Sequence, residues 1–305
     1  MSYKTDRRAA PSPVVRAAGW MVGALVSFLT MALAGRELAA ELSTFQILFF
    51  RSLIGVVVLG LLLGRTGWGQ LRTSHVRLHL VRNVAHFGGQ FAWFYGLAMI
   101  PLAEVFALEF TTPLWTALLA ALILGERLTL TRIAALTLGM VGLLIILRPG
   151  FQVIQPATIG VLVGAMAFAV AHIATKRLAR HDSPLSILFY MTIIQLPLAL
   201  LPTLMSWVLP GVALWPWLLL VGLCALSAHY CVTRALTLAD ATVVVPMDFL
   251  RLPLVALVGA LFYQEPIDGL VLLGAAVMML GIWINVRGER VKNRNRNVTG
   301  DPKHV

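Results

Sequence analysis

Long apolar segments, separated by short polar turns, follow one another along almost the whole chain. A helix that crosses a bilayer needs about 20 mostly apolar residues, and ten segments come close to this length. Backbone N–H and C=O groups find no water to bond in lipid, so each segment is predicted to be an α-helix. The ten predicted spans cover roughly residues 17–35, 44–64, 83–100, 105–124, 131–147, 157–175, 184–207, 214–233, 241–263 and 269–286.

The composition agrees with a membrane protein. Of the 305 residues, 59% are hydrophobic and only 12% are charged, whereas soluble domains carry about 25% charged residues. The two cysteines, Cys224 and Cys231, lie in one apolar segment at a spacing that fits no metal-binding motif. We therefore expect no metal site, no disulfide framework and no bound cofactor.

The distribution of cations predicts the orientation in the membrane. If the N-terminus is cytoplasmic, 20 of the 24 Lys and Arg residues fall in inside loops and tails. This count takes Arg82 as a loop cation, because it precedes the predicted third span. Arg36 and Arg148 fall in outside loops, and Arg51 and Arg251 lie within spans. Such an excess of inside cations predicts that both termini are cytoplasmic, and it explains the net charge of +11 without nucleic acid.

The chain contains an internal repeat. The segment "FLTMALAGRELAAELSTFQILFF" (28–50) aligns with "FAVAHIATKRLARHDSPLSILFY" (168–190), and "ALLAALILGE" (117–126) aligns with "ALVGALFYQE" (256–265). Each copy holds five predicted spans, and this odd number turns the second copy upside down in the membrane. Inverted repeats are typical of transporters, with the substrate site near the midplane. The predicted tails and repeats are 1–16, 17–148, 157–286 and 287–305.

The fourth predicted span of each repeat contains a proline, a run of apolar residues and a glutamate at or just after its end: "PLWTALLAALILGE" (113–126) and "PLVALVGALFYQE" (253–265). In this pattern, over roughly residues 17–286, the chain resembles the EamA-type branch of the drug/metabolite transporter superfamily. The resemblance implies an all-α inner-membrane carrier of small organic solutes, often an exporter, that works by alternating access without an ATPase domain. In keeping with this, the chain has no GxxxxGK[ST] motif.

The resemblance marks Glu126 and Glu265 as part of the family pattern. Both lie beside turns at the ends of predicted spans. We expect each carboxylate to hydrogen-bond the N-terminus of the next helix along the chain, because the helix dipole favours an anion there. We do not expect either glutamate to bind substrate.

Four charged residues lie inside predicted spans. A charge at the bilayer centre costs about 2.5–3.5 kcal/mol on insertion scales, so such residues normally face a partner or a cavity. Glu109 and Asp248 occupy matching places in the two repeats, and Asp248 lies three residues before Arg251, where the two can form an ion pair. Glu109 has no cation nearby on its own helix, so we expect Arg51, aligned with Met191 in the second repeat, to be its partner.

A functional interpretation is that these charges form a central amphoteric site. Carboxylates would bind a substrate ammonium group or a proton, and guanidinium groups would bind a carboxylate or phosphate. His86, Gln90 and Trp93 are spaced four and three residues apart, so they share one helix face and suit a binding pocket. A lone histidine such as His172 is instead interpreted as an interhelical hydrogen-bond donor. The predicted substrate-binding residues are Arg51, His86, Gln90, Trp93, Glu109, His229, Asp248 and Arg251.

The sequence favours a secondary transporter of a small polar or zwitterionic metabolite, such as an amino acid or an amino-carboxylate metallophore. Export is the favoured direction, a proton is a candidate coupling ion, and the protein is expected to be a monomer or homodimer. The main alternative is an uptake carrier for a vitamin or cofactor such as riboflavin or S-adenosylmethionine. A membrane enzyme acting on lipid-linked substrates is less favoured, because no interfacial catalytic cluster or HExxH motif is present. A channel would not need the duplicated architecture.

Overall fold

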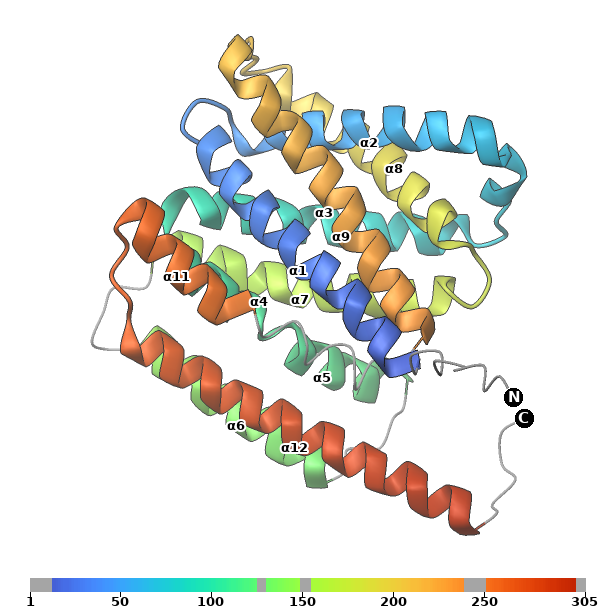
Figure 1. The fold of residues 1–305 in the computed structure, drawn as a ribbon, viewed down its shortest axis with the longest axis vertical. Helices are drawn as coiled ribbons and strands as arrows, with labels where there is room; N and C mark the ends of the chain where they lie inside the picture. Colours follow the sequence, from blue (N-terminus) through green and yellow to red (C-terminus); the bar gives the residue numbers. More distant parts are fainter. Residues whose placement is uncertain (1–12, 125–129, 149–154, 239–250, 300–305) are drawn as a thin grey trace, which may run out of the picture.

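The computed structural model describes residues 13–124, 130–148, 155–238 and 251–299, and all regular structure in these ranges is helical (Figure 1). This part of the chain therefore confirms the all-α prediction. The helices are α1 (Pro13–Leu38), α2 (Thr44–Thr66), η1 (Trp68–Leu71), α3 (Val76–Met99), α4 (Leu102–Glu109), α5 (Thr112–Leu124), α6 (Leu130–Leu147), α7 (Pro156–Leu178), α8 (Pro184–Thr203), η2 (Val212–Leu214), α9 (Trp215–Leu238), α11 (Arg251–Tyr263) and α12 (Gly269–Thr299).

Five stretches are long and apolar enough to cross a membrane, and three shorter apolar stretches accompany them. The five are Val15–Leu38, Thr44–Thr66, Pro156–Leu178, Pro184–Thr203 and Val212–Ala235. Helix α3 spans a comparable length but carries buried charged and amide side chains, which lower its hydropathy. The protein is a multi-pass membrane protein, and the count of ten spans stays a prediction.

The repeat is visible in how corresponding helices begin. Ser43 precedes α2, and its side chain accepts a hydrogen bond from the backbone N–H of Gln46 at 3.3 Å. Ser183, aligned with Ser43, precedes α8 and accepts from the backbone N–H of Ser186 at 3.1 Å. Serine is a favoured N-cap because its hydroxyl satisfies an N–H that has no partner within the helix. The two repeats thus start their second helices in the same way.

Helices from the two repeats pack against each other. The most extensive helix pairs are α1 with α9, α3 with α7, α6 with α12 and α2 with α8, and each pair joins the first repeat to the second. In the repeat, α1 corresponds to α7, and α3 corresponds to α9. The α1–α9 and α3–α7 pairs are therefore equivalent contacts, each between the first helix of one repeat and the third helix of the other. The halves are therefore interlocked, and each completes the core of the other.

Two of these interfaces depend on glycine. A Cβ at Gly142 of α6 would collide with the backbone O of Gly274 in α12, and a Cβ at Gly274 would lie 2.6 Å from the backbone O of Gly142. In the α3–α7 pair, a Cβ at Gly89 would lie 3.0 Å from the backbone O of Gly164. Small residues let helix backbones approach closely in membranes, so these glycines set the interhelical distance.

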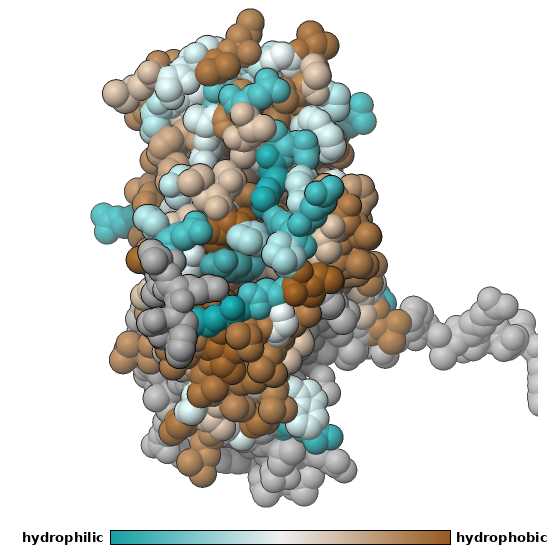
Figure 2. Space-filling view, turned by 90° about the vertical axis from the view of Figure 1, so that its left-hand side faces the viewer, coloured by the Kyte–Doolittle hydropathy of each residue, from teal (hydrophilic) through white to brown (hydrophobic). Residues whose placement is uncertain are grey.

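We name the two ends of the molecule by where α1 begins and where it ends. The near end is where α1 begins and where α3 also begins. The far end is where α1 ends, on the left of Figure 1, together with the turn between α11 and α12. Figure 2 faces the far end and shows hydrophilic side chains across its middle, with hydrophobic surface around them.

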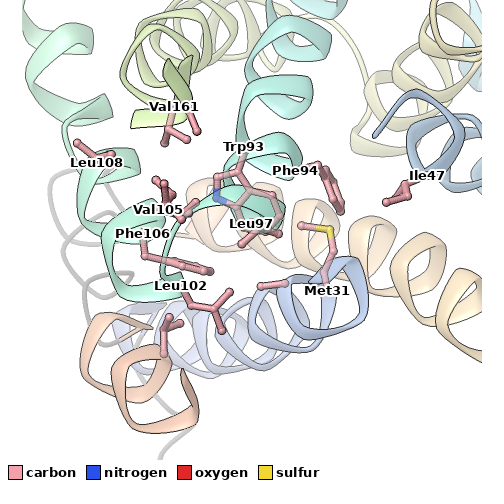
Figure 3. Packing of buried hydrophobic residues seen from close by; sticks show 14 of the residues in the cluster. Met31, Ile47, Trp93, Phe94, Leu97, Leu102, Val105, Phe106, Leu108 and Val161 are labelled. Atoms are coloured by element: carbon pink, nitrogen blue, oxygen red, sulfur yellow. The ribbon is translucent and has the colours of Figure 1, made fainter. Parts of the chain in front are cut away.

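The fourth predicted span is broken at Phe110 and Thr111. Helix α4 starts at the far end and stops at Glu109, and α5 starts at Thr112. The α4 side chains Leu102, Val105 and Phe106 are fully buried. They pack towards Trp93 and Leu97 of α3 (Figure 3). Discontinuous helices in transporters often form the substrate site. The break therefore places Glu109 at an interior helix end, held by an apolar core.

Candidate functional site

Helix α3 carries a buried polar stripe along one face. Apart from one adjacent pair, Arg82 and Asn83, its members recur every three or four residues, the spacing that keeps side chains on one side of a helix. The α3 stripe consists of His79, Arg82, Asn83, His86, Gln90 and Trp93, all buried. It runs from the near end towards the interior. The predicted clustering of His86, Gln90 and Trp93 on one buried face therefore agrees with the structure.

Arg51 of α2 faces the middle of the α3 stripe. Its Nη1 donates to Oε1 of Gln90 at 3.2 Å and to Oε1 of Gln195, on α8, at 3.4 Å. Gln195 in turn donates from Nε2 to Nδ1 of His86 at 3.0 Å and to the backbone O of Asn83 at 3.3 Å. Amide oxygens from α3 and α8 therefore hold the guanidinium group of Arg51, and His86 holds one of these amides.

The charge of Arg51 is not neutralised by this cluster. The residue is 2% exposed, and its Nε and Nη2 are buried without a hydrogen-bond partner. Among the described residues, no carboxylate lies within ion-pair distance of it. A buried charge is costly unless it is paired and hydrogen-bonded. Arg51 therefore has two donor nitrogens, Nε and Nη2, available for an anion.

Glu109 forms a second polar cluster beside the first. Its Oε2 accepts a hydrogen bond from the indole Nε1 of Trp93 at 2.9 Å, and its Oε1 lies 3.4 Å from Nη2 of Arg251. The guanidinium group of Arg251 also lies over the rings of Phe28 and Phe106, with 4.4 and 5.3 Å to the ring centroids. Aromatic faces attract cations, so Arg251 is held by a carboxylate and by aromatic rings together.

This geometry corrects one prediction. Glu109 was expected to pair with Arg51, but its partners in the structure are Trp93 and Arg251. The cation comes from α11 of the second repeat, because the interlocked packing brings α11 against α4. The predicted contact between Asp248 and Arg251 lies outside the described residues, as do Asp248 itself and Glu126.

The remaining predicted residue, His229 of α9, lies beside the α3 stripe. Its ring centroid is 5.0 Å from that of His86 and 5.7 Å from that of Phe28. His172 is exposed, although Val161 and Ala165 on the same side of α7 are buried. The structure thus brings His86, Gln90 and Arg51 into one cluster, and Trp93, Glu109 and Arg251 into another, joined through the α3 stripe.

Sequence reasoning missed two residues of the candidate site, Gln195 and Arg82. Gln195 was left out of the candidates, although a lone glutamine in an apolar segment is a signal of an interior partner. Arg82 was counted as a loop cation, but it is buried inside α3 at 4% exposure. Its Nε donates to Oγ1 of Thr175 at 3.1 Å and its Nη1 to Oδ1 of Asn83 at 2.5 Å. Helix α3 begins seven residues before the predicted third span. The predicted span starts too late because polar residues on the inner face of the helix interrupt its apolar pattern.

The expected role of Glu265 also needs correction. Its Oε2 accepts a hydrogen bond from the backbone N–H of Leu102 at 2.9 Å, and its Oε1 pairs with Nη1 of Arg36 at 2.8 Å. Leu102 begins α4, a helix of the first repeat, whereas the next helix along the chain is α12. The first turn of α12 is capped instead by Asp268, whose Oδ1 accepts from the backbone N–H of Leu270 at 2.9 Å.

At the near end, Asp182 connects the turn after α7 to the start of α3. Its Oδ2 accepts hydrogen bonds from Nε2 of His79 at 2.8 Å and from Oγ1 of Thr73 at 2.9 Å. A metal site is a separate question. Within the described ranges, no group of three or more His, Cys, Asp or Glu side chains is arranged so that it could bind a metal ion.

The family model of the EamA-like transporter family matches residues 15–148 and again 155–287, which is nearly the whole chain. This chain belongs to the EamA-like transporter family. The resemblance inferred from the two proline-to-glutamate segments is therefore confirmed. A solved crystal structure aligns with a TM-score of 0.64 at 20% identity, covering 88% of this chain and 95% of that one, and it supports the fold alone.

Relatives of this EamA protein are transporters of chemically different metabolites. The riboflavin transporter of Rhizobium johnstonii is 32% identical over 95% of this chain and 97% of its own length. The S-adenosylmethionine uptake transporter of Rickettsia bellii is 27% identical over 86% of this chain and 90% of its own. The pseudopaline exporter CntI of Pseudomonas aeruginosa is 29% identical over 86% and 93%. The family and these relatives are transporters rather than enzymes, and they include both directions of transport.

Proposed function

We propose that this EamA protein is a secondary active transporter of a small zwitterionic metabolite, and that Arg51 binds the carboxylate of that metabolite. Amino acids and amino-carboxylate compounds are the substrate class that fits, and export is the favoured direction. The observation that carries the proposal is the buried guanidinium group of Arg51, whose Nε and Nη2 have no hydrogen-bond partner and whose contacts are neutral amides. A carboxylate matches a guanidinium group in charge and in geometry.

The rest of the predicted site completes an amphoteric environment. Glu109 is 17% exposed at the end of a broken helix, so it is placed to exchange its contact with Arg251 for a substrate ammonium group or a proton. Trp93 orients this carboxylate, and His86, Gln90 and His229 supply neutral hydrogen-bonding groups. Asp248 is proposed to act with Arg251 on the second-repeat side. No step in this role is a covalent reaction, so we do not propose an enzyme.

We further propose that the near end faces the cytoplasm and that the protein lies in the inner membrane with both termini inside. The cation distribution along the chain supports this orientation. The proposed moving units are the two repeats, 17–148 and 157–286. Helix pairs that join the repeats, such as α1 with α9 and α3 with α7, are the contacts across which alternating access would occur.

A second candidate is uptake of a vitamin such as riboflavin. It is supported by the riboflavin transporter relative that matches over 95% of this chain, and by Trp93 and Gln90 on the α3 stripe. An aromatic ring system can stack on an indole, and its polar edge can bond the amides. In this case Arg51 would bind a neutral polar group of the ligand. Its charge would then contribute less to binding than it would with a carboxylate.

The test compares cells that produce the wild-type protein, Arg51→Met, or the control Arg77→Met, which removes an exposed cation. Untargeted analysis of metabolites in cells and medium identifies the compound whose distribution depends on the protein. We expect a zwitterionic carboxylate that Arg51→Met no longer moves and that Arg77→Met moves normally. Uptake of labelled S-adenosylmethionine and riboflavin into proteoliposomes then separates the two candidates. Normal transport by Arg51→Met at equal membrane level contradicts the carboxylate role.

A further inference from the structure

Arg82 is a second buried cation without an ion-pair partner. It lies on the α3 stripe, two helical turns from Gln90, and its contacts are the neutral oxygens of Thr175 and Asn83. Among the described residues, no carboxylate lies within ion-pair distance of its guanidinium group. Arg82, like Arg51, is therefore a buried charge that lacks a counter-charge among the described residues. It lies closer to the near end than Arg51 does.

The two arginines belong to one hydrogen-bonded chain. Arg51 donates to Gln195, Gln195 donates to the backbone O of Asn83, and the side chain of Asn83 accepts from Arg82. Gln195 and Asn83 thus link the two guanidinium groups, and no described carboxylate pairs with either of them. Two like charges held together in an interior of low dielectric are unfavourable. A ligand with negative charge at both positions would relieve the repulsion and bond the unpartnered Nε and Nη2 of Arg51.

The nearby carboxylate of Asp182 does not occupy this role. Its side chain is 3% exposed, and its Oδ2 accepts from His79 and Thr73 instead of from Arg82. Asp182 thus fixes the start of α3 to the turn after α7. The rival explanation is that Arg82 is a structural bridge between α3 and α7 whose charge Asp182 balances from a distance. This rival predicts no effect of Arg82 on which ligand binds.

We infer that Arg51 and Arg82 form a two-point anion site, and that the zwitterionic substrate carries two acidic groups, for which dicarboxylates are the simplest probes. This inference rests on the proposed function for the role of Arg51 and adds Arg82 as a second subsite. One acid group binds Arg51 between Gln90 and Gln195, and the other binds Arg82 beside Asn83 and Thr175. A monocarboxylate fills one position and leaves the other guanidinium group unpaired.

The test measures equilibrium binding to the full-length detergent-purified protein. The probes are the unbranched dicarboxylates from succinate to pimelate, each compared with its own monoamide, with the dissociation constant taken from the ligand-dependent rise in melting temperature. The variants are Arg82→Gln, which keeps a hydrogen-bonding side chain without charge, Arg82→Lys, which keeps the charge, and the exposed control Arg77→Gln. Arg51→Met serves as the reference for the first subsite.

For at least one chain length, the wild-type protein is expected to bind the dicarboxylate about tenfold more tightly than the monoamide, because a charge-assisted hydrogen bond replaces a neutral one. Arg82→Gln should abolish this preference while still binding the monoamide, Arg82→Lys should keep part of it, and Arg77→Gln should keep all of it. Arg51→Met should weaken both ligands.

Equal affinity for dicarboxylate and monoamide at every chain length, or no binding of any probe, overturns the inference. An Arg82→Gln variant that still prefers dicarboxylates also overturns it. Failure of the proposed function is a separate outcome, since it is read from transport by Arg51→Met. If Arg82→Gln does not melt cooperatively, the comparison of Arg82→Lys with wild type decides, because a structural bridge would leave the ligand preference unchanged.

Discussion

The carboxylate of Glu265 caps a helix that belongs to the other half of the chain: its Oε2 accepts a hydrogen bond from the backbone N–H of Leu102, the first residue of α4, at 2.9 Å. The same carboxylate pairs with Arg36 at the end of α1, and the side chain of Arg36 donates to the backbone O of Ile100 at 3.2 Å. One glutamate of the second repeat thus fixes three segments of the first repeat at the far end.

Replacing Glu265 with alanine should lower the stability of the folded protein. The change removes a helix cap, which typically contributes about 1 kcal/mol, and it leaves Arg36 without its ion-pair partner. We expect a lower melting temperature of the detergent-purified protein. Glu41→Ala is the control, because Glu41 is exposed at the same end and should leave the melting temperature nearly unchanged. Equal melting temperatures for Glu265→Ala and wild type would mean that the cap contributes nothing.

Replacing Gly142 with alanine should force α6 and α12 apart. The added methyl group would meet the backbone O of Gly274 and lie 2.7 Å from Cγ of Met278, and overpacking of this kind typically costs about 1–3 kcal/mol. Gly160→Ala is a matched control, since nothing lies within 4 Å of its Cβ position and alanine favours a helix. Thermal melting of the two variants should therefore move in opposite directions, and a shared direction contradicts the close-contact assignment.

Glu109→Gln should abolish or strongly reduce transport while the protein still reaches the membrane. The amide keeps the size of the side chain and can accept from Trp93, but it cannot neutralise Arg251, bind an ammonium group or take up a proton. Trp93→Phe should reduce transport less, because it keeps the ring and removes only the indole N–H that orients Glu109. Substrate flux per unit of membrane protein checks both. Full, pH-dependent flux by Glu109→Gln would move the charged role to another residue, with Asp248 the next to test.

Asp268 should make a small contribution to stability that disappears in acid. This residue lies in the turn between α11 and α12, outside the membrane-spanning helices. Burial alone would raise the pKa of Asp268, but hydrogen bonds from Arg148 and from the backbone N–H groups of Leu270 and Val271 lower it below 3.8. A pKa that is lower in the folded state stabilises the protein above the unfolded value, and this stabilisation is lost as the pH falls through the folded value.

The measurement is the difference in melting temperature between wild type and Asp268→Asn as the pH is lowered. Wild type should be slightly more stable at neutral pH, since partly exposed ion pairs contribute little. The melting temperatures of wild type and Asp268→Asn should converge as the pH falls below 3.8, the ordinary pKa of an aspartate. A difference that grows in acid would have the wrong sign and would reject the assignment.

Reporter fusions should place the C-terminus in the cytoplasm. A fusion after Val305 is expected to give a cytoplasmic signal and a fusion near Phe151 a signal from the opposite side, because the inside segments hold most of the cations. An external C-terminus would contradict the topology and the inversion of the second repeat.

The sequence by itself determined the class of fold and placed three polar residues of the candidate site on one helix face. The length and spacing of apolar segments predict membrane helices, because lipid requires every backbone polar group to be bonded within its own helix. The repeated segments predict two related halves, and the matched serines Ser43 and Ser183 cap corresponding helices as this requires. Helical periodicity alone placed His86, Gln90 and Trp93 on one face.

Only the tertiary structure decided which residues meet. Periodicity defines a helix face but not the helix that packs against it, so the partner of Glu109 could not be read from the chain and proved to be Arg251. The same holds for Glu265, which caps α4 across the repeats, and for Arg82, whose burial follows from the packing of α3 on α7. Each of these contacts joins the two halves, and such contacts depend on how the halves interlock because their residues lie far apart along the chain.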